Sequence, residues 1–305
     1  MNENCKRWKG EQEYKGDDAP EGVETWSDYF RLMAPEKAVI QRTLYAEAFS
    51  DEAKKAGFEI CPEEALADAI IINTCGFIES AKAEAIEVTE EELNAAFRPN
   101  TKAVFGETIA NPAGSVLDIE RMAKIAHKHG VPLIIDNTFA TPVNCRPFEF
   151  GADIVTHSTT KYMDGHACAV GGVIVDSGNF DWEAYHDKFK GLTEPDPSYH
   201  GLAYTKAFGK GAYITKATAQ LMRDLGSIQS PQNAFLLNIG LETLHLRVPR
   251  HCENALAVAK YLQNHPKVAW VDYAGLEGNK YYELSKKQFT NGLPCGVLTF
   301  GVKGG

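Results

Sequence analysis

The chain has 305 residues, of which 44% are hydrophobic and 24% charged, as is usual for a globular protein with a substantial core. Its formal net charge of −10 argues against nucleic-acid binding, and no apolar run is long enough to cross a bilayer. Residues 1–18 contain no secretory signal, and the seven cysteines form no CxxC pair. We therefore expect a cytoplasmic protein with reduced thiols and neither a nucleic-acid nor a membrane partner.

The first 87 residues form two predicted parts. Residues 1–44 keep neither a helical nor a strand period, so they are an unassigned head that we expect to be loose or partly helical. Residues 45–87 predict a strand–turn–helix fragment. In this fragment a helical piece ends at Gly57, a strand covers Ala69 to Ile72, and a short helix follows the turn at 73–76.

Strands and helices alternate clearly from residue 100 onward. The predicted strands are "TKAVFGE", "VPLIIDN", "ADIVTHS" and "GGVIVDSG". The segment "SVLDIERMAKIAHKHG" predicts a helix that ends at Gly130, with an apolar face made of Val116, Leu117, Ile119, Met122, Ile125 and Ala126. The unbroken apolar run of "VPLIIDN" is typical of a strand buried on both faces. This order predicts an α/β fold in which residues 88–247 form a mostly parallel sheet covered by helices.

A second region follows. Residues 231–264 predict two helices, "PQNAFLLNIGLETLHLR" and "RHCENALAVAKYLQNH", and strands resume in "VAWVDYAG" and "GVLTFGVKGG". We expect residues 248–305 to be the start of a smaller C-terminal α/β domain that is truncated at residue 305.

Polar side chains follow three of the predicted strands. They are Glu107 and Asn111 after the first, Asp136 after the second, and Ser158, Thr160 and Lys161 after the third. Because ligands of parallel sheets bind at the carboxyl ends of the strands, we expect these groups to form one site. A carboxylate, two hydroxyls and a lysine suit pyridoxal phosphate: the amine forms a Schiff base with the aldehyde, the carboxylate faces the ring nitrogen, and the hydroxyls donate to the phosphate.

Each of these residues also has a plainer interpretation. A lone lysine such as Lys161 is more often a solvated surface residue. Asp136 could simply cap a turn, and Ser158 and Thr160 could be helix N-caps. The combination favours the cofactor site. His157 and His166 lack a third ligand at suitable spacing, so no metal site is predicted, and Cys168 is expected to be a small buried residue rather than a nucleophile.

Several long motifs resemble the Cys/Met-metabolism family of pyridoxal-phosphate enzymes. They are "GETIANP", "AHKHGVPLIIDNTFATP", "FGADIVTHSTTKYMDGH" and "GGVIVDSGNFDW". The stretches "LTEPDPSYHGLAY", "SPQNAFLLNIGLETLHLR" and "HPKVAWVDYAGL" resemble its O-acetylhomoserine sulfhydrylase branch in particular. The likeness covers about residues 88–305 and implies the fold of type I pyridoxal-phosphate transferases.

The resemblance also implies roles and a reaction. Lys161 would be the Schiff-base lysine, Asp136 the partner of the ring nitrogen, Asn111 a contact near the phenolic oxygen, and Ser158 with Thr160 phosphate ligands. The reaction would be γ-replacement, in which sulfide displaces acetate from O-acetylhomoserine and gives homocysteine. Family members usually assemble as tetramers with shared sites, so a homo-oligomer is expected.

Two departures from the family pattern lower the activity that we expect. Residues 1–87 contain no phosphate-binding Ser-Gly-Met, and the family's carboxylate-binding arginine is not matched by Arg223, Arg247 or Arg250. Residues 53–87 instead resemble the N-terminal domain of radical-SAM methylthiotransferases, with Cys75 at a cluster-ligand position but without the other ligands. Open alternatives are an inactive α/β fusion fragment, an iron–sulfur fragment, and a cystathionine synthase or lyase of the same family.

Overall fold

The computed structural model describes residues 39–41, 59–61 and 90–304, which divide into two compact units. In the first unit, strand β1 (Val39–Gln41) pairs in parallel with strand β2 (Glu59–Cys61). The predicted strand at 69–72, the turn at 73–76, the helix after it and Cys75 lie outside the described residues. Helix α4 (Glu90–Ala96) precedes the strands of the second unit.

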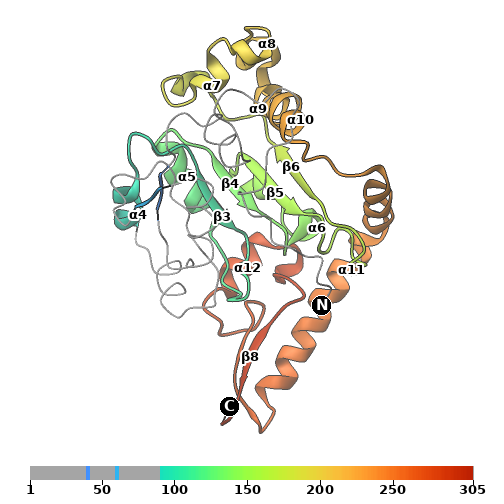
Figure 1. The fold of residues 1–305 in the computed structure, drawn as a ribbon. Helices are drawn as coiled ribbons and strands as arrows, with labels where there is room; N and C mark the ends of the chain where they lie inside the picture. The colour runs from blue at the N-terminus through green and yellow to red at the C-terminus, as the bar shows by residue number, and fades with distance from the viewer. Residues whose placement is uncertain (1–38, 42–58, 62–89, 305) are drawn as a thin grey trace. The chain divides into compact units, whose positions relative to one another are not determined.

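The second unit contains a four-stranded sheet in the order β3-β4-β5-β6 (Figure 1). Its strands are β3 (Val104–Glu107), β4 (Leu133–Asp136), β5 (Ile154–Ser158) and β6 (Gly172–Asp176). The first three are parallel and β6 is antiparallel to β5, which confirms a mostly parallel sheet with one reversed edge strand. Strand β4 is fully buried on one face, at Leu133 and Ile135, but only half-buried on the other.

Helix α5 (Ile119–Lys128) connects β3 to β4 and begins later than the sequence predicts. Asp118 caps its N-terminus, because the Asp118 side chain accepts a hydrogen bond from the Arg121 N–H at 3.0 Å. Val116 lies before the helix, where it forms an isolated bridge with Ile109. The predicted stop is confirmed: Gly130 follows the C-cap with a φ of +65°, a left-handed conformation that glycine adopts without strain.

Short helices fill the connections between the strands and the long C-terminal helix. Helix α6 (Thr141–Asn144) and the 3-10 turn η2 (Pro147–Phe150) join β4 to β5. After β6 come η3 (Glu183–Tyr185), α7 (Lys190–Thr193), η4 (Pro197–Tyr199), α8 (Tyr204–Phe208), η5 (Gly209–Gly211), α9 (Ala212–Lys216), the π-helical turn η6 (Ala217–Met222) and α10 (Arg223–Leu225). An aromatic cluster that includes Phe180, Trp182 and Tyr204 packs these turns onto Ile154 of β5.

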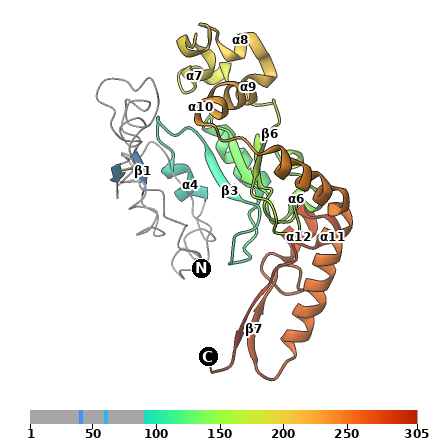
Figure 2. The same ribbon diagram turned by 45° about the vertical axis from the view of Figure 1, so that its right-hand side comes forward.

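The chain ends with helix α11 (Pro231–Gln263), strand β7 (Val268–Asp272), helix α12 (Tyr282–Gln288), turn η7 (Thr290–Gly292) and strand β8 (Thr299–Val302). Strands β7 and β8 pair antiparallel, and α11 runs beside them (Figure 2). The middle of α11, from Leu244 to Cys252, packs on Met163, two residues after Lys161. Its last turns, at Ala255 and Ala259, pack on Tyr273, just after β7. The helix therefore ties the segment after Lys161 to the C-terminal strands.

The prediction of two helices between residues 231 and 264 is wrong, because α11 continues through Pro249. An interior proline costs a helix about 3 kcal/mol, since it removes one hydrogen bond and crowds the preceding turn. The apolar stripe, however, keeps one phase across the proline: its buried members are Leu244, Val248, Cys252, Ala255 and Ala259. Packing on both sides of Pro249 outweighs its local cost. The proposed domain boundary at 247/248 falls inside this helix, and the division at that point stays a prediction.

No helix in the described part of the chain is both long enough and apolar enough to cross a membrane.

Candidate active site

The carboxyl ends of β3, β4 and β5 lie side by side, as the sequence predicts. In the strand register Asp136 is paired with Glu107 on one side and with Thr156 on the other. The hydrogen bonds continue past the strands: the Thr108 N–H donates to the Asp136 carbonyl, and the Asn137 N–H donates to the Thr156 carbonyl, both at 2.9 Å. Asp136 therefore stands at the middle of this edge, next to the segment that carries Lys161.

Thr138 joins Asp136 to Ser158, a link that the sequence analysis missed. The Thr138 hydroxyl donates to Asp136 Oδ1 at 2.5 Å and accepts the Ser158 N–H at 2.8 Å, and the Thr138 N–H also donates to Oδ1 at 2.9 Å. The turn-cap interpretation of Asp136 therefore applies to Oδ1, which accepts both hydrogen bonds from Thr138. Among the described residues no hydrogen bond is formed by Asp136 Oδ2, which leaves that oxygen for a ligand.

Replacing Thr138 with valine, which has nearly the same shape, is expected to lower the free energy of unfolding by about 1–3 kcal/mol, because it leaves the Ser158 N–H without its acceptor. Thr138→Ser should restore most of the loss, since it keeps the hydroxyl. Urea denaturation of the two variants measures this. Equal stability of Thr138→Val and the wild type would show that the bridge contributes nothing.

The segment after β5 carries Lys161. Its backbone N–H donates to the Ser158 carbonyl at 3.2 Å, and its side chain is exposed. The Thr160 hydroxyl donates to the Gly171 carbonyl at 3.2 Å and accepts the Gly171 N–H at 3.0 Å. Thr160 would thus have to release that carbonyl before it could donate to a phosphate, whereas no hydrogen bond is formed by the Ser158 hydroxyl within the described residues. The helix N-cap interpretation fits neither residue, because this segment consists of turns.

His157 lies buried between Thr156 and Ser158 on β5. Burial lowers the pKa of His157, and the negative charge of Asp136 offsets only part of that effect. The imidazole is therefore mostly neutral at pH 7. Its Nδ1 is buried and has no hydrogen-bond partner among the residues that the structure describes. A neutral imidazole does not form an ion pair with Asp136.

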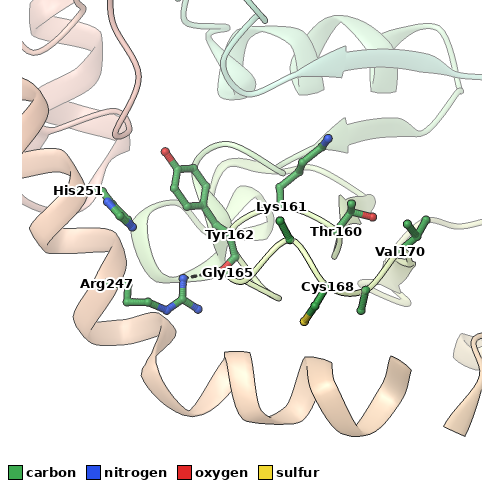
Figure 3. A pocket seen from close by; sticks show the side chains of 10 residues that line it. Thr160, Lys161, Tyr162, Gly165, Cys168, Val170, Arg247 and His251 are labelled. Atoms are coloured by element: carbon green, nitrogen blue, oxygen red, sulfur yellow. Dashed lines mark hydrogen bonds between the residues drawn. The ribbon is translucent and has the colours of Figure 1, made fainter. Parts of the chain in front are cut away.

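A cavity of about 510 Å³ adjoins this segment (Figure 3). Its described lining includes Thr160, Lys161, Cys168, Arg247 and His251, and no described lining residue is acidic. Asp136, Ser158 and Asn111 do not line it, so the cavity covers only one side of the predicted site. Asn111 is exposed after β3, where its backbone N–H donates to Glu107 Oε2 at 3.2 Å.

Asp164 organises the turn after Lys161, a role that the sequence analysis also missed. Its buried Oδ2 accepts the N–H groups of His166 at 3.2 Å and Cys168 at 3.1 Å, and its Oδ1 accepts the Cys168 thiol at 3.3 Å. The expectation of a buried Cys168 is wrong: the residue is exposed, and the bond to Asp164 is the main cause that raises the pKa of its thiol. A raised pKa disfavours the reactive thiolate.

Burial alone would raise the pKa of Asp164, but the hydrogen bonds from Cys168 and His166 together hold it below its usual range. A carboxylate of this kind stabilises the fold at pH values above its ordinary pKa, and that contribution is lost as the pH falls through the lower folded value. Asp164→Asn should lower the free energy of unfolding by about 1.5–3 kcal/mol near pH 7. The difference between wild type and variant should shrink below about pH 4. Urea titrations at pH 7 and pH 3 test this; an equal difference at both values would contradict it.

Within residues 39–41, 59–61 and 90–304, no three His, Cys, Asp or Glu side chains are grouped so that they could hold a metal ion. The donor set at the strand ends does fit pyridoxal phosphate. Lys161 supplies an amine, Asp136 supplies a carboxylate oxygen without a partner in the described structure, and Ser158 supplies a hydroxyl. These are the groups that would meet the aldehyde, the ring nitrogen and the phosphate.

The model of the Cys/Met metabolism PLP-dependent enzyme family matches residues 78–305. The chain belongs to this family. The match begins inside the stretch at 53–87, ten residues earlier than the motifs indicated, and the methylthiotransferase-like resemblance before residue 78 stays a prediction.

Curated relatives in this family are about half identical to the chain over the matched region. A homocysteine/cysteine synthase of Saccharomyces cerevisiae is 50% identical over 214 residues, which are 70% of this chain and 48% of that protein. A homocysteine synthase of Schizosaccharomyces pombe is 51% identical over 215 residues, 70% of this chain and 50% of that protein. An O-acetyl-L-homoserine sulfhydrylase of Leptospira meyeri is 46% identical over 223 residues, again 70% and 50%. The chain spans about half the length of these relatives.

Two solved structures have the same fold. One, described as an O-acetylhomoserine (thiol)-lyase of Campylobacter jejuni with a pyridoxyl-lysine phosphate, superposes with a TM-score of 0.73 at 32% identity, covering 90% of this chain and 64% of that chain. An O-acetylhomoserine sulfhydrylase of Wolinella succinogenes gives a TM-score of 0.65 at 29% identity, covering 87% and 65%. The chain therefore has the type I fold of pyridoxal-phosphate enzymes, as predicted.

Proposed function

We propose that this protein catalyses a pyridoxal-phosphate-dependent γ-replacement. Sulfide displaces acetate from O-acetylhomoserine, so that the Cγ–O bond breaks, a Cγ–S bond forms, and homocysteine and acetate are released. The observation that carries this proposal is the placement of Lys161, Asp136 and Ser158 at adjacent strand ends, in a chain about 50% identical to homocysteine synthases.

The roles of the site residues follow from their chemistry. Pyridoxal phosphate, when bound, accepts the electrons that are released as the substrate loses a proton from Cα. Asp136 would keep a proton on the ring nitrogen through a charge-assisted hydrogen bond from that nitrogen to Oδ2. The Ser158 hydroxyl would donate to the phosphate, joined by Thr160 once it has released Gly171, and Asn111 would contact the ring's phenolic oxygen. The Lys161 amine would carry protons between the α and β carbons of the substrate.

The test is homocysteine formation from O-acetylhomoserine and sulfide, with added pyridoxal phosphate. We expect turnover that requires the cofactor and falls by about 10²–10⁴-fold or more in Lys161→Ala. We also expect a rate well below that of the longer relatives, because no phosphate-binding Ser-Gly-Met occurs in residues 1–87. If the chain binds the cofactor at Lys161 but forms no homocysteine, the proposed reaction is wrong. If cysteine is offered in place of sulfide and the chain forms cystathionine but never homocysteine, the chain belongs to another branch of the family.

We also propose a cytoplasmic homo-oligomer. The free thiols Cys145, Cys252 and Cys295 are buried and unpaired, as suits a reducing compartment, and apolar side chains are exposed along α11, among them Phe235, Leu246 and Tyr261. Sedimentation velocity should give a particle of at least twice the mass of one chain, and a monomer at micromolar concentration would contradict the assembly.

A further inference from the structure

The segment after Lys161 is bound to helix α11 by one arginine. Arg247 Nη1 donates to the carbonyl of Tyr162 at 2.8 Å, the bond drawn in Figure 3. Arg247 Nη2 donates to the carbonyl of Gly240 at 2.7 Å, and Nε donates to the Thr243 hydroxyl at 3.0 Å. The guanidinium thus joins the Tyr162–Met163 peptide, one residue beyond Lys161, to the first half of α11. Three of its five N–H groups donate to oxygens of the protein.

Two glycines allow this close approach. A Cβ atom at Gly165 would lie 2.5 Å from Arg247 Nη1, so a side chain there would displace the guanidinium. A Cβ atom at Gly240 would collide with the backbone carbonyls of Met163 and Asp164. Helix α11 and the segment 162–165 therefore meet backbone to backbone, with Arg247 beside the contact.

The position of Lys161 is set from both sides. On its N-terminal side Thr138 joins Ser158 to Asp136, and on its C-terminal side Arg247 fixes the Tyr162 peptide. Figure 3 shows the Lys161 side chain pointing away from α11. Since a lysine side chain has four flexible carbon–carbon bonds, the place of its backbone decides which volume the amine can reach.

We propose that Arg247 is a positioning residue: it holds the backbone at Lys161 so that the amine stays directed toward the site at the strand ends. This inference rests on the proposed role of Lys161. It does not require Arg247 to touch the substrate, because the contacts of the guanidinium are to the protein itself. Arg247 acts together with Gly165, which leaves it the space it needs.

The experiment compares Arg247→Gln, Arg247→Lys and Gly165→Ala with Arg250→Gln. Arg250 lies three residues along the same helix, is largely exposed, and within the described part of the chain forms an ion pair only with Glu253, at 3.6 Å, so its variant is the matched control. Two readouts need no cofactor: hydrogen exchange of the amides in residues 161–169, and the acylation rate of the Lys161 amine mapped by mass spectrometry. A third is the yield of borohydride-fixed pyridoxal phosphate on Lys161.

Arg247→Gln should raise the exchange of residues 161–169 about tenfold or more, because hydrogen bonds from a charged group are lost. It should also change the acylation rate and lower the yield of fixed cofactor. Arg247→Lys should recover part of each effect, and Arg250→Gln should match the wild type. Gly165→Ala should show at least the effect of Arg247→Gln, because it displaces the guanidinium and also strains a backbone whose φ at Gly165 is +71°. The double variant should be no worse than Gly165→Ala alone, because the Arg247 contact is already lost there.

Unchanged exchange and acylation in Arg247→Gln, with an altered KM for the substrate alone, would overturn the inference and make Arg247 a substrate ligand. Melting curves identify a variant that fails to fold. If Arg247→Gln fails to fold, the exchange and acylation of Gly165→Ala and Arg247→Lys decide whether Arg247 positions Lys161. If the wild type binds no pyridoxal phosphate, the proposed function fails, and exchange and acylation still decide whether Arg247 fixes Lys161.

Discussion

Replacing Lys161 with alanine should abolish the covalent linkage of pyridoxal phosphate and the visible absorption of the bound cofactor. It should also lower homocysteine formation by about 10²–10⁴-fold or more, since the amine both carries the cofactor and moves the protons of the substrate. Lys161→Arg should fail equally, because a guanidinium stays protonated at working pH. The measurement is an absorption spectrum beside a homocysteine assay.

The matched control for Lys161 is Lys206→Ala, which removes an exposed lysine paired with Glu183 at 3.1 Å. That variant should keep the absorption band and the turnover of the wild type, because exposed ion pairs contribute little. If Lys161→Ala instead gives a borohydride-reducible adduct in unchanged yield, another amine carries the cofactor, and the solvated-surface interpretation of Lys161 is correct.

Replacing Asp136 with asparagine should weaken pyridoxal phosphate binding by about ten- to a hundredfold in Kd. That range corresponds to about 1.5–3 kcal/mol for the loss of a charge-assisted hydrogen bond. Asparagine keeps a carbonyl oxygen that can accept from Thr138, so the turn after β4 should survive. Titration of the variant with cofactor, followed by absorbance, measures the change.

Asp136→Ala separates the two interpretations of this carboxylate. If Asp136 only caps the turn, Asp136→Asn should bind cofactor as the wild type does, and Asp136→Ala should lose stability alone. If its charge holds the ring nitrogen, both variants should lose affinity, and the alanine should also melt at a lower temperature. Cofactor affinity in Asp136→Asn equal to that of the wild type would exclude the charge-based role.

The strand ends were predictable because parallel strands bring their carboxyl ends to one edge of a sheet. Apolar runs followed by polar residues were enough to place Asp136 beside the segment of Lys161, and the strand register confirms that placement. The fold class followed from the same order of elements. For α11 the local rule failed. Proline ends most helices, but α11 continues through Pro249 because the buried apolar residues keep the same helical spacing on both sides of it.

The contacts that fix the site could not be predicted from local patterns. The hydrogen bond from Arg247 to the Tyr162 carbonyl joins residues 85 positions apart, and the bond from Ser158 to Thr138 spans 20. Such pairs leave no period in the sequence, because neither residue type nor spacing marks the partner. A glycine in an apolar helix face, as at Gly240, is the one local signal that could have pointed to a close backbone contact.

The central claim is that Lys161 carries pyridoxal phosphate. The most direct measurement adds the cofactor to the purified chain, reduces the mixture with borohydride, digests the protein, and maps the modified peptide by mass spectrometry. We predict one pyridoxyl group per chain, on Lys161, with the same peptide unmodified when reduction is omitted. A stable pyridoxyl group on another lysine, or none on any peptide at saturating cofactor, would contradict the account.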